Sequence, residues 1–294
     1  APPIGAALAR AARATGPHDR VIDLDPHTKI CLYAVRAQPA VPGEAEPLVR
    51  VPKRRAPQPS PEEAVFADLQ VLGRARRLTD WMFAQYRSEV HGLVAEVGAG
   101  IGTYTERILA GGAREVLALE PEPACAAALE RRFAGDPRVT VARDTLPAAP
   151  VLAARAGEVD LVVCQNVLEH IDAQGAAVTS MAAALVPGGH LALIVPAHPR
   201  LFGPLDRIYG HHRRYTAAGL RRLLSDAELE VDELHAFNLL GVPGWWFKNR
   251  RAGAQIGPAS LRAYEALAGL WRPLEERVRP PWGLSLVALA RRPG

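Results

Sequence analysis

The sequence predicts an α/β fold, in which helices cover both faces of a mainly parallel sheet of about seven strands. Short apolar segments alternate with helix-like segments between residues 93 and 195, and turn-forming Gly and Pro residues bound them. The first of these segments ends in a loop with glycine at every second position. Two further strand-like segments, 229–237 and 284–290, follow near the end of the chain. Alternation of this kind is typical of parallel strands that are buried on both faces.

The elements are expected in the following order. Residues 1–60 predict a small β-rich extension that ends in a proline-rich linker, and residues 61–85 predict a helix with a break at Gly73. Ser60 provides the side-chain cap of that helix. The strands are expected at 93–97, 115–119, 138–142, 159–164, 190–195, 229–237 and 284–290, with helices at 104–110, 123–133 and 217–224. The stretch 238–281 carries several aromatic residues and predicts an inserted cap.

The composition argues against several classes of protein. Hydrophobic residues make up 49% and charged residues 22%, as in ordinary globular enzymes. The sequence shows no apolar run of the roughly 18 residues that span a membrane, and no signal-peptide pattern, so we expect a cytoplasmic protein without a membrane partner. Cys31, Cys125 and Cys164 lack metal-ligand spacing, so neither a disulfide nor a metal site is expected. The 35 basic residues are almost all arginine, and we expect no nucleic-acid partner; a homodimer stays open.

The glycine loop follows the first strand, in the sequence Glu-Val-Gly-Ala-Gly-Ile-Gly from Glu96 to Gly102. Glycine has no Cβ, so Gly98, Gly100 and Gly102 let a ligand approach the main chain closely. A dinucleotide fingerprint needs a glycine where Thr103 stands, so an NAD-dependent oxidoreductase is disfavoured. The pattern E-x-G-x-G-x-G instead resembles motif I of the class I S-adenosylmethionine-dependent methyltransferases.

This resemblance covers about residues 62–294, and it implies a Rossmann-like sheet with an antiparallel last strand and S-adenosylmethionine as the cofactor. In the family, an acid in the position of Glu96 faces the cofactor's amino group, and one in the position of Glu120 accepts both ribose hydroxyls. An acid in the position of Asp144 accepts a hydrogen bond from the adenine, although Asp144 is alternatively a helix cap. The implied cofactor site consists of Glu96, Gly98, Ala99, Gly100, Gly102, Glu120, Pro121, Asp144, Thr145, Leu146, Gln165 and Asn166.

The segment after the fourth strand, from Gln165 to His170, resembles that of methyltransferases that modify quinones, sugars and antibiotics. A proton acceptor near the methyl group is needed only for a hydroxyl or a protonated amine, and histidine takes a proton near neutral pH. We expect His198 to be this base because it follows the fifth strand, with His211 and His212 as the next candidates. Each of these histidines is alternatively a loop anchor or a substrate ligand.

Substrate contacts are expected in the same loops and in the cap. Arg213 can bind an anionic group, although it is alternatively part of a helix entry. Three adjacent aromatic residues begin at Trp245 and are too close in sequence for one helix face. At least one of them is therefore expected to face the substrate cleft or another chain. The candidate substrate-binding residues are Arg213, Tyr215, Trp245 and Trp246.

These observations predict an S-adenosylmethionine-dependent methyltransferase that acts on a small molecule, at oxygen or at nitrogen. The methyltransferase domain is expected at 61–294, after the extension and linker at 1–60. The stretch from Asn166 to Gly241 resembles methyltransferase domains found beside sugar-transferring enzymes, which indicates a glycan or natural-product acceptor. The alternatives are an enzyme of the same fold that catalyses cyclisation or rearrangement without net methyl transfer, an oxidoreductase, and a non-catalytic binding protein.

Overall fold

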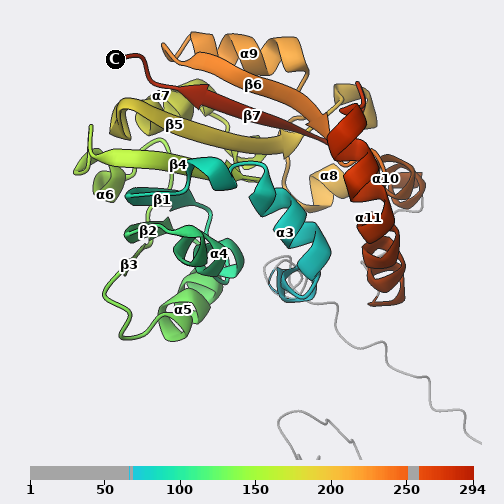
Figure 1. Ribbon diagram of the computed structural model, residues 1–294, viewed down its shortest axis with the longest axis horizontal. Helices are drawn as coiled ribbons and strands as arrows, with labels where there is room; N and C mark the ends of the chain where they lie inside the picture. The colour runs from blue at the N-terminus through green and yellow to red at the C-terminus, as the bar shows by residue number, and fades with distance from the viewer. Residues whose placement is uncertain (1–65, 67–68, 251–257) are drawn as a thin grey trace, which may run out of the picture. The chain divides into compact units, whose positions relative to one another are not determined.

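The computed structural model describes residue 66, residues 69–250 and residues 258–294, all within the unit that spans residues 57–294 (Figure 1). The extension and linker predicted at 1–60 lie outside the described residues. The described strands are β1 (Leu93–Val97), β2 (Glu115–Leu119), β3 (Val139–Ala142), β4 (Val159–Gln165), β5 (Leu185–Pro196), β6 (Glu230–Phe237) and β7 (Ser285–Arg291). The α-helices are α3 (Arg76–Ala84), α4 (Thr103–Gly111), α5 (Pro123–Arg132), α6 (Pro150–Ala153), α7 (Gln174–Ala184), α8 (Pro204–Ile208), α9 (Ala217–Ser225), α10 (Gly241–Arg250) and α11 (Pro258–Val278). Single-turn helices are η1 (Arg87–Glu89), η2 (Leu168–His170) and η3 (Pro199–Leu201).

The strands form one sheet in the order β3-β2-β1-β4-β5-β7-β6. β1 pairs in parallel with β2 on one side and with β4 on the other, so the strand order reverses between β1 and β4. β7 lies antiparallel to both β5 and β6. The predicted sheet of about seven strands with an antiparallel last strand is confirmed. Ligands of open parallel sheets bind at the carboxyl ends of the strands, beside the point of reversal.

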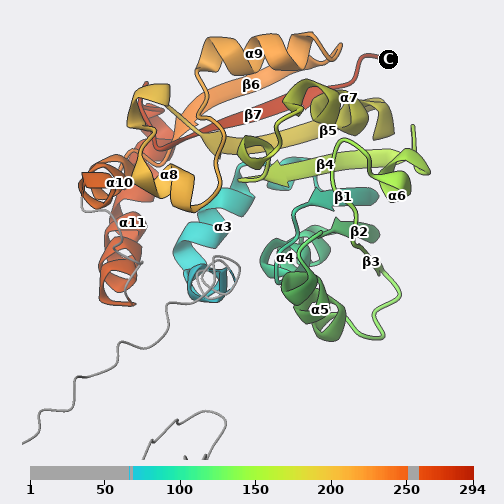
Figure 2. The ribbon, with the colours of Figure 1, turned by 180° about the vertical axis from the view of Figure 1, so that it is seen from behind.

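Two apolar layers cover the sheet. β1 is buried at all five positions. One layer joins the sheet to α6, α7 and α9 and includes Met181 and Leu224. The other joins the sheet to α3, α4 and α5 and includes Trp81 and Ile108. Figures 1 and 2 show the helices and the sheet from opposite directions. Because both layers pack against the same strands, they fix the positions of the strand ends that carry the candidate site.

The observed elements differ from the predicted ones mainly at their ends. β1 and β2 have the predicted bounds. β5 begins at Leu185 rather than at residue 190, because residues 185–189 form an irregular part of the strand with a shifted register against β4. The helix predicted at 61–85 is interrupted at Arg74 and Ala75, directly after the expected break at Gly73.

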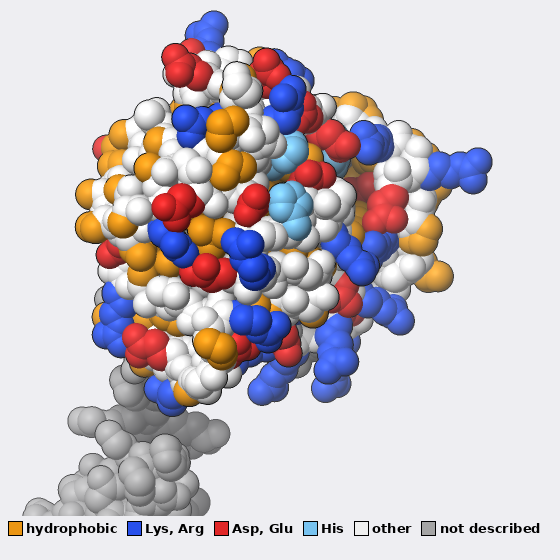
Figure 3. Space-filling view, turned by 60° about the vertical axis from the view of Figure 1, so that its left-hand side comes forward, with side chains coloured by type: hydrophobic (Ala, Val, Ile, Leu, Met, Phe, Trp, Pro, Cys, Tyr) orange, Lys and Arg blue, Asp and Glu red, His pale blue; other side chains and the backbone are white. Residues whose placement is uncertain are grey.

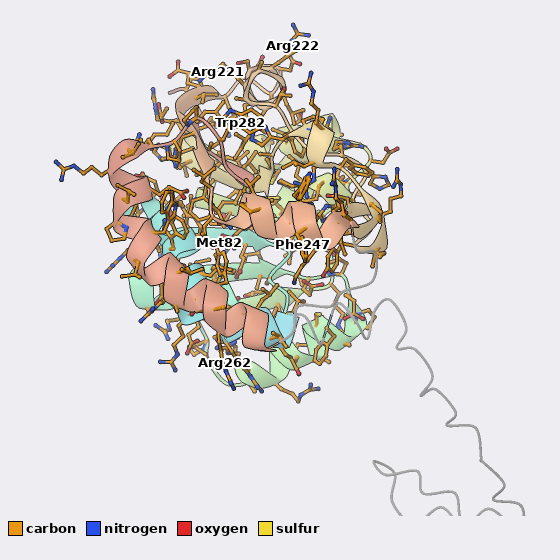
Figure 4. The ribbon with its side chains drawn as sticks, turned by 90° about the vertical axis from the view of Figure 1, so that its right-hand side faces the viewer. Met82, Arg221, Arg222, Phe247, Arg262 and Trp282 are labelled. Atoms are coloured by element: carbon orange, nitrogen blue, oxygen red, sulfur yellow. The ribbon has the colours of Figure 1, made fainter. Side chains whose placement is uncertain are left out.

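Two helices, α10 and α11, lie between β6 and β7 in the chain, where the sequence predicts a cap. Glu265 of α11 accepts hydrogen bonds from two main-chain N–H groups in the first turn of α3 (3.0 and 2.9 Å). Glu275 of α11 accepts one from the main-chain N–H of Asn238, just after β6 (2.5 Å). Main-chain N–H groups at the ends of helices and strands lack a partner within their own element, and the two carboxylates accept hydrogen bonds from such groups. These bonds fix α11 against α3 and β6. Figure 4 shows α10 and α11 in the foreground, with Phe247 on α10 and Arg262 on α11.

The surface carries charges of both signs. Figure 3 shows Lys and Arg side chains interspersed with Asp and Glu over one face of the described part of the chain. Among the helices of the described residues, none has both the length and the apolar character that crossing a membrane requires.

Candidate active site

The glycine loop connects the end of β1 to the start of α4. Gly98, Gly100 and Gly102 have left-handed backbone conformations, with φ angles of 75°, 56° and 83°, which residues with a Cβ rarely adopt. The main-chain N–H groups of Gly98 and Ala99 donate to the carbonyl of Leu119 at the end of β2 (2.8 and 3.0 Å). The loop is therefore held at the carboxyl ends of β1 and β2, where the sequence predicts the cofactor.

The three glycines are needed for different reasons. A Cβ at Gly98 would lie 2.2 Å from Cγ2 of Val167, and a Cβ at Gly102 would lie 2.6 Å from the ring of Phe133. A Cβ at Gly100 would meet no described atom closer than 3.6 Å. Gly98 and Gly102 thus permit close packing within the protein, whereas at Gly100 it is the left-handed backbone conformation, rather than a clash, that favours glycine.

Glu120, directly after β2, aims its carboxylate at the loop. It accepts hydrogen bonds from the main-chain N–H groups of Gly100 (2.7 Å) and Glu122 (3.0 Å), and it is 7% exposed. Burial raises the pKa of this carboxyl, while the two N–H groups lower it. A carboxylate held in this way can accept hydrogen bonds from the two hydroxyls of a ribose, and that contact stays a prediction.

Glu96 lies in β1, with its side chain on the face that α4 covers. It is 3% exposed, and its Oε2 accepts a hydrogen bond from Oγ1 of Thr105 (2.5 Å). Burial raises the pKa of Glu96 to about 8, and the hydrogen bond from Thr105 opposes that rise. Contact between Glu96 and the cofactor's amino group stays a prediction, because the structure pairs this carboxyl with Thr105.

The residues predicted to surround the adenine follow β2 and β3. Asp144 accepts a hydrogen bond from the main-chain N–H of Val151, in the first turn of α6 (2.9 Å). Leu146 is 6% exposed and belongs to the core, whereas Pro121 and Thr145 are exposed. Asp144 thus has the capping role that the sequence offers as an alternative, and its contact with the adenine stays a prediction.

Gln165 ends β4, and Asn166 follows it. Oε1 of Gln165 is buried and has no hydrogen-bond partner among the described residues. An unpaired buried polar atom is costly, so this oxygen indicates a ligand group at the end of β4. Asn166 is exposed, with a φ angle of 53°, and its main-chain N–H donates to the carbonyl of Ile194 in β5 (2.8 Å). This bond ties the segment after β4 to the neighbouring strand.

His198 stands two residues after the end of β5. Its ring stacks on that of Trp282, with centroids 4.4 Å apart. Its Nε2 is buried and has no hydrogen-bond partner among the residues that the structure describes. Burial lowers the pKa of His198, and the positive charge of Arg214 lowers it further. The ring is therefore neutral at neutral pH and able to accept a proton.

A buried acid, Asp206, organises the loop that carries His211 and Arg214. It is 0% exposed, and it accepts hydrogen bonds from the main-chain N–H of Gly203 (2.9 Å), Nδ1 of His211 (2.9 Å) and Nε of Arg214 (2.8 Å). Burial raises the pKa of Asp206, but the bond from His211 and the charge of Arg214 outweigh this and hold it below its usual value. The Arg214 guanidinium lies over the ring of Trp245 in α10, 4.6 Å from its centroid. The structure thus joins the histidine loop to the cap.

Two residues of η2, Glu169 and His170, also belong to this region, although they were not predicted from the sequence as site residues. Glu169 is 1% exposed, and its Oε1 lies 3.9 Å from Nε2 of His211. The rings of His170 and His211 meet edge to face, with centroids 4.8 Å apart. Burial raises the pKa of Glu169 to about 8 and lowers that of His170 to about 4. One feature of the sequence does point to these two residues: an acid and a histidine closely follow a buried strand at its carboxyl end. Functional groups of open parallel sheets gather at this end of the strands.

The remaining predicted residues have other surroundings. His212 is exposed. Arg213 donates to the main-chain carbonyl of Ile171 (2.7 Å) and so anchors the segment after η2. Tyr215 is 6% exposed, and its hydroxyl donates to a glutamine side chain at the start of α7 (2.9 Å), which fixes it in the core. Trp246 is 46% exposed. Of these four, His212 and Trp246 present their side chains to solvent.

Comparison with known proteins supports the family that the loop resembles. A family profile described as a methyltransferase domain matches residues 69–234, which is more than half of the chain. An uncharacterized methyltransferase-like protein of Schizosaccharomyces pombe is 29% identical over 117 residues, which cover 40% of this chain and 43% of that protein. The chain thus matches less than half the length of this curated relative.

Solved structures share the fold at low sequence identity. Phosphoethanolamine N-methyltransferase 2 of Haemonchus contortus, in complex with S-adenosyl-L-methionine, superposes with a TM-score of 0.50 at 15% identity, over 77% of this chain and 57% of that one. The cyclase SpnF superposes with a TM-score of 0.51 at 17% identity, over 80% of this chain and 97% of that one. At such identities the similarity shows the fold alone.

The described residues fit the cofactor of this family. Gly100 has a left-handed conformation at the carboxyl end of β1, the Glu120 carboxylate accepts a hydrogen bond from its N–H, and Oε1 of Gln165 is buried without a partner among the described residues. The family match, the sheet order and these groups agree. The chain belongs to the methyltransferase domain family, whose cofactor is S-adenosylmethionine, and its sheet has the fold of S-adenosylmethionine-dependent methyltransferases.

Proposed function

We propose that this methyltransferase methylates an oxygen or nitrogen of a small glycan-like or natural-product-like molecule, with His198 as the proton acceptor. The observation that carries the proposal is the Nε2 atom of His198, which is buried and has no hydrogen-bond partner among the described residues. His198 follows β5, at the same edge of the sheet as the glycine loop after β1. A base at this edge is within the region where a bound acceptor and the cofactor must meet.

The surroundings of His198 suit it to accept a proton. Burial and the charge of Arg214 lower its pKa, so the ring is neutral near pH 7. Its stacking on Trp282, at 4.4 Å between centroids, restricts the orientation of the ring. S-adenosylmethionine, when bound, supplies a methyl group that is already electrophilic. The protein therefore has to align the acceptor, exclude water and remove one proton.

Aromatic side chains support a glycan-like or natural-product-like acceptor. Trp282 is 57% exposed beside His198, and Trp246 of α10 is 46% exposed. Trp245 lies against Arg214 at 4.6 Å, and its Nε1 is buried without a hydrogen-bond partner among the described residues. Aromatic rings with a polar edge bind flat or ring-shaped molecules through their faces and through one directed hydrogen bond. These residues are the proposed acceptor contacts.

The test combines product mass with one substitution. S-adenosylmethionine that carries a deuterated methyl group is incubated with the protein and a panel of hydroxylated and amine-bearing glycans and natural products. The expected product carries the labelled methyl group. His198→Gln is expected to lower kcat on the order of a hundredfold, with unchanged cofactor affinity. His91→Gln is the matched control, because His91 is 62% exposed just before β1, at the opposite end of the strands.

The outcomes separate the proposed reaction from its alternative. A changed product without the label would favour cyclisation or rearrangement by the same fold. Labelled product with full activity in His198→Gln would move the base to His211 or His212. For the wild type, kcat is expected to fall as the pH drops and His198 becomes protonated, and a rate independent of pH would contradict base catalysis by histidine.

A further inference from the structure

Three side chains near the carboxyl end of β4 form a group with metal-binding chemistry. Glu169, His170 and His211 each bring one potential ligand atom, and these atoms lie within 4.8 Å of one another. Glu169 and His170 come from η2, which follows β4, whereas His211 comes from the loop between α8 and α9. Carboxylate and imidazole are the usual ligands of Zn²⁺ and related divalent transition metals.

The state of Glu169 is the strongest evidence for a ligand. Its side chain is 1% exposed, and within the described part of the chain neither carboxylate oxygen accepts a hydrogen bond from another residue. The nearby guanidinium of Arg214 donates instead to Asp206 (2.8 Å) and to the carbonyl of Ala197 (3.1 Å). A buried carboxylate without hydrogen bonds is costly. A cation coordinated by this carboxylate would offset that cost.

Both histidines are held in the manner of metal ligands. Nδ1 of His211 is hydrogen bonded to Oδ1 of Asp206 (2.9 Å), so its Nε2 faces Oε1 of Glu169 at 3.9 Å. The His170 ring is hydrogen bonded to the main chain of Gly210. Metal-binding histidines commonly use their second nitrogen in this way, toward a carboxylate or a main-chain carbonyl. Because His170 is exposed, an ion can reach the group from solvent.

We propose that Glu169, His170 and His211 bind one divalent transition-metal ion of the Zn²⁺ type, with Asp206 orienting His211. Two imidazoles and one carboxylate are a known ligand set of zinc sites that keep a fourth position open. Bonds of about 2.0 to 2.2 Å separate neighbouring ligand atoms by about 3.3 to 3.6 Å in a tetrahedron, so modest side-chain rotations would close this group around an ion. The open position can take an oxygen of the acceptor. Contact between the ion and an acceptor oxygen rests on the proposed function, whereas binding of the ion does not.

The group could instead be an acid paired with two histidines that never binds an ion. In that case Glu169 would be neutral and buried, and His211 would serve only to hold Asp206. The two explanations differ in one measurable quantity, the stoichiometric and tight uptake of a metal by the isolated protein. Each of the three side chains must also contribute to that uptake if the proposal is correct.

The test uses the full chain without a histidine tag, stripped with a chelator and dialysed. Calorimetric titration with ZnCl₂ is expected to show one ion per chain, and Co²⁺ is expected to give the visible absorption of a four-coordinate site. Glu169→Gln and His211→Gln should each weaken Zn²⁺ affinity by more than about a hundredfold, and Asp206→Asn by about tenfold to a hundredfold. His91→Gln, at the other end of the strands, should leave the stoichiometry and affinity unchanged.

Circular dichroism checks that each variant is folded, and His170→Asn provides a second ligand variant at an exposed position. The proposal is wrong if the wild type takes up neither ion, or if folded Glu169→Gln and His170→Asn variants bind Zn²⁺ as the wild type does. Tight Zn²⁺ uptake together with no labelled product from any acceptor would count against the proposed function and leave the metal site standing. Labelled product from metal-free protein at the full rate would restrict the ion to a structural role at this site.

Discussion

The two halves of the carboxyl edge of the sheet are built in different ways. The cofactor half, the glycine loop with Glu120, comes from one short stretch of chain and is held by main-chain hydrogen bonds. The half proposed to bind the acceptor, called the acceptor half here, joins Glu169, Asp206, Arg214 and Trp245, which come from four segments, and it is held by buried charges and ring contacts. Main-chain geometry therefore determines the first half, and side-chain pairing determines the second. Substitutions should accordingly act on one half without altering the other.

The largest expected effect is that of Gly98→Ala on the cofactor half. A Cβ at this position would lie 2.2 Å from Cγ2 of Val167, on a residue whose φ angle is 75°, so the loop or the segment after β4 must shift. We expect affinity for S-adenosylmethionine to fall by more than about a hundredfold in calorimetric titration. Adding Val167→Ala removes the clash and should restore part of the affinity.

Gly135→Ala is the matched control for backbone strain. Gly135 has a φ angle of 84°, and its Cβ would meet no described atom within 4 Å. This variant should lose about 1 to 3 kcal/mol of stability and keep its cofactor affinity. Equal cofactor affinity in Gly98→Ala and the wild type would contradict the assignment of the loop.

The next largest effect is expected for Glu120→Ala. This change removes the carboxylate that accepts from the N–H of Gly100 and that the family uses for the ribose. Loss of hydrogen bonds to a charged acceptor costs about 1.5 to 3 kcal/mol, so cofactor affinity should fall about tenfold to a hundredfold. Glu130→Ala, an exposed acid of α5, is the control. No change in Kd for Glu120→Ala would mean that the ribose is held by other groups.

The cofactor half could be predicted from sequence because its determinants are local. An apolar strand, three alternating glycines and an acid after the next strand identify it, and the bounds of β1 and β2 agree with the prediction. Asp144 shows the limit of local reasoning. The sequence allows both a capping and a cofactor role, and only the packing of α6 reveals the hydrogen bond to Val151.

The acceptor half could not be predicted in the same way. Glu169 and His211 lie far apart in the chain and become neighbours only because the loop before α9 folds over the end of β4. Tyr215 is a candidate substrate contact by sequence, yet its hydroxyl bonds to α7 within the core. Whether a polar residue after a strand faces a ligand or the core depends on elements from elsewhere in the chain, so its type and spacing do not determine its role.

An effect of another kind, on the pH dependence of stability, is expected for Glu96→Gln. The pKa of Glu96 is about 8 in the folded protein and near 4.5 when the side chain is in water. The folded state therefore binds more protons between these values, and the stability that Glu96 contributes is lost as the pH rises through about 8. Urea unfolding at a series of pH values should show the free energy of unfolding falling with pH over this range. Glu96→Gln should reduce the slope by about 1 kcal/mol per pH unit, compared with a maximum of about 1.4 for one proton.

Glu130→Gln serves as the exposed control for that measurement. Its slope of unfolding free energy against pH should match that of the wild type. If the slope of Glu96→Gln also matches the wild type, the carboxyl of Glu96 is ionised in the folded protein. The cofactor half would then carry a negative charge beneath its loop at neutral pH.

The smallest effect is expected in the acceptor half, for Trp245→Phe. Nε1 of Trp245 is buried without a hydrogen-bond partner among the described residues, while the ring packs on Arg214 at 4.6 Å. Phenylalanine keeps most of the packing and removes the donor. If this N–H donates to the acceptor, its loss costs about 1 kcal/mol, so KM for the acceptor should rise about fivefold while the Kd of the cofactor stays constant.

The same change at Trp246, which is 46% exposed, locates the acceptor, because a larger rise in KM there would place the acceptor on the outer face of α10. An equal loss of acceptor and cofactor affinity in Trp245→Phe would show that the two halves are coupled, contrary to their separate construction.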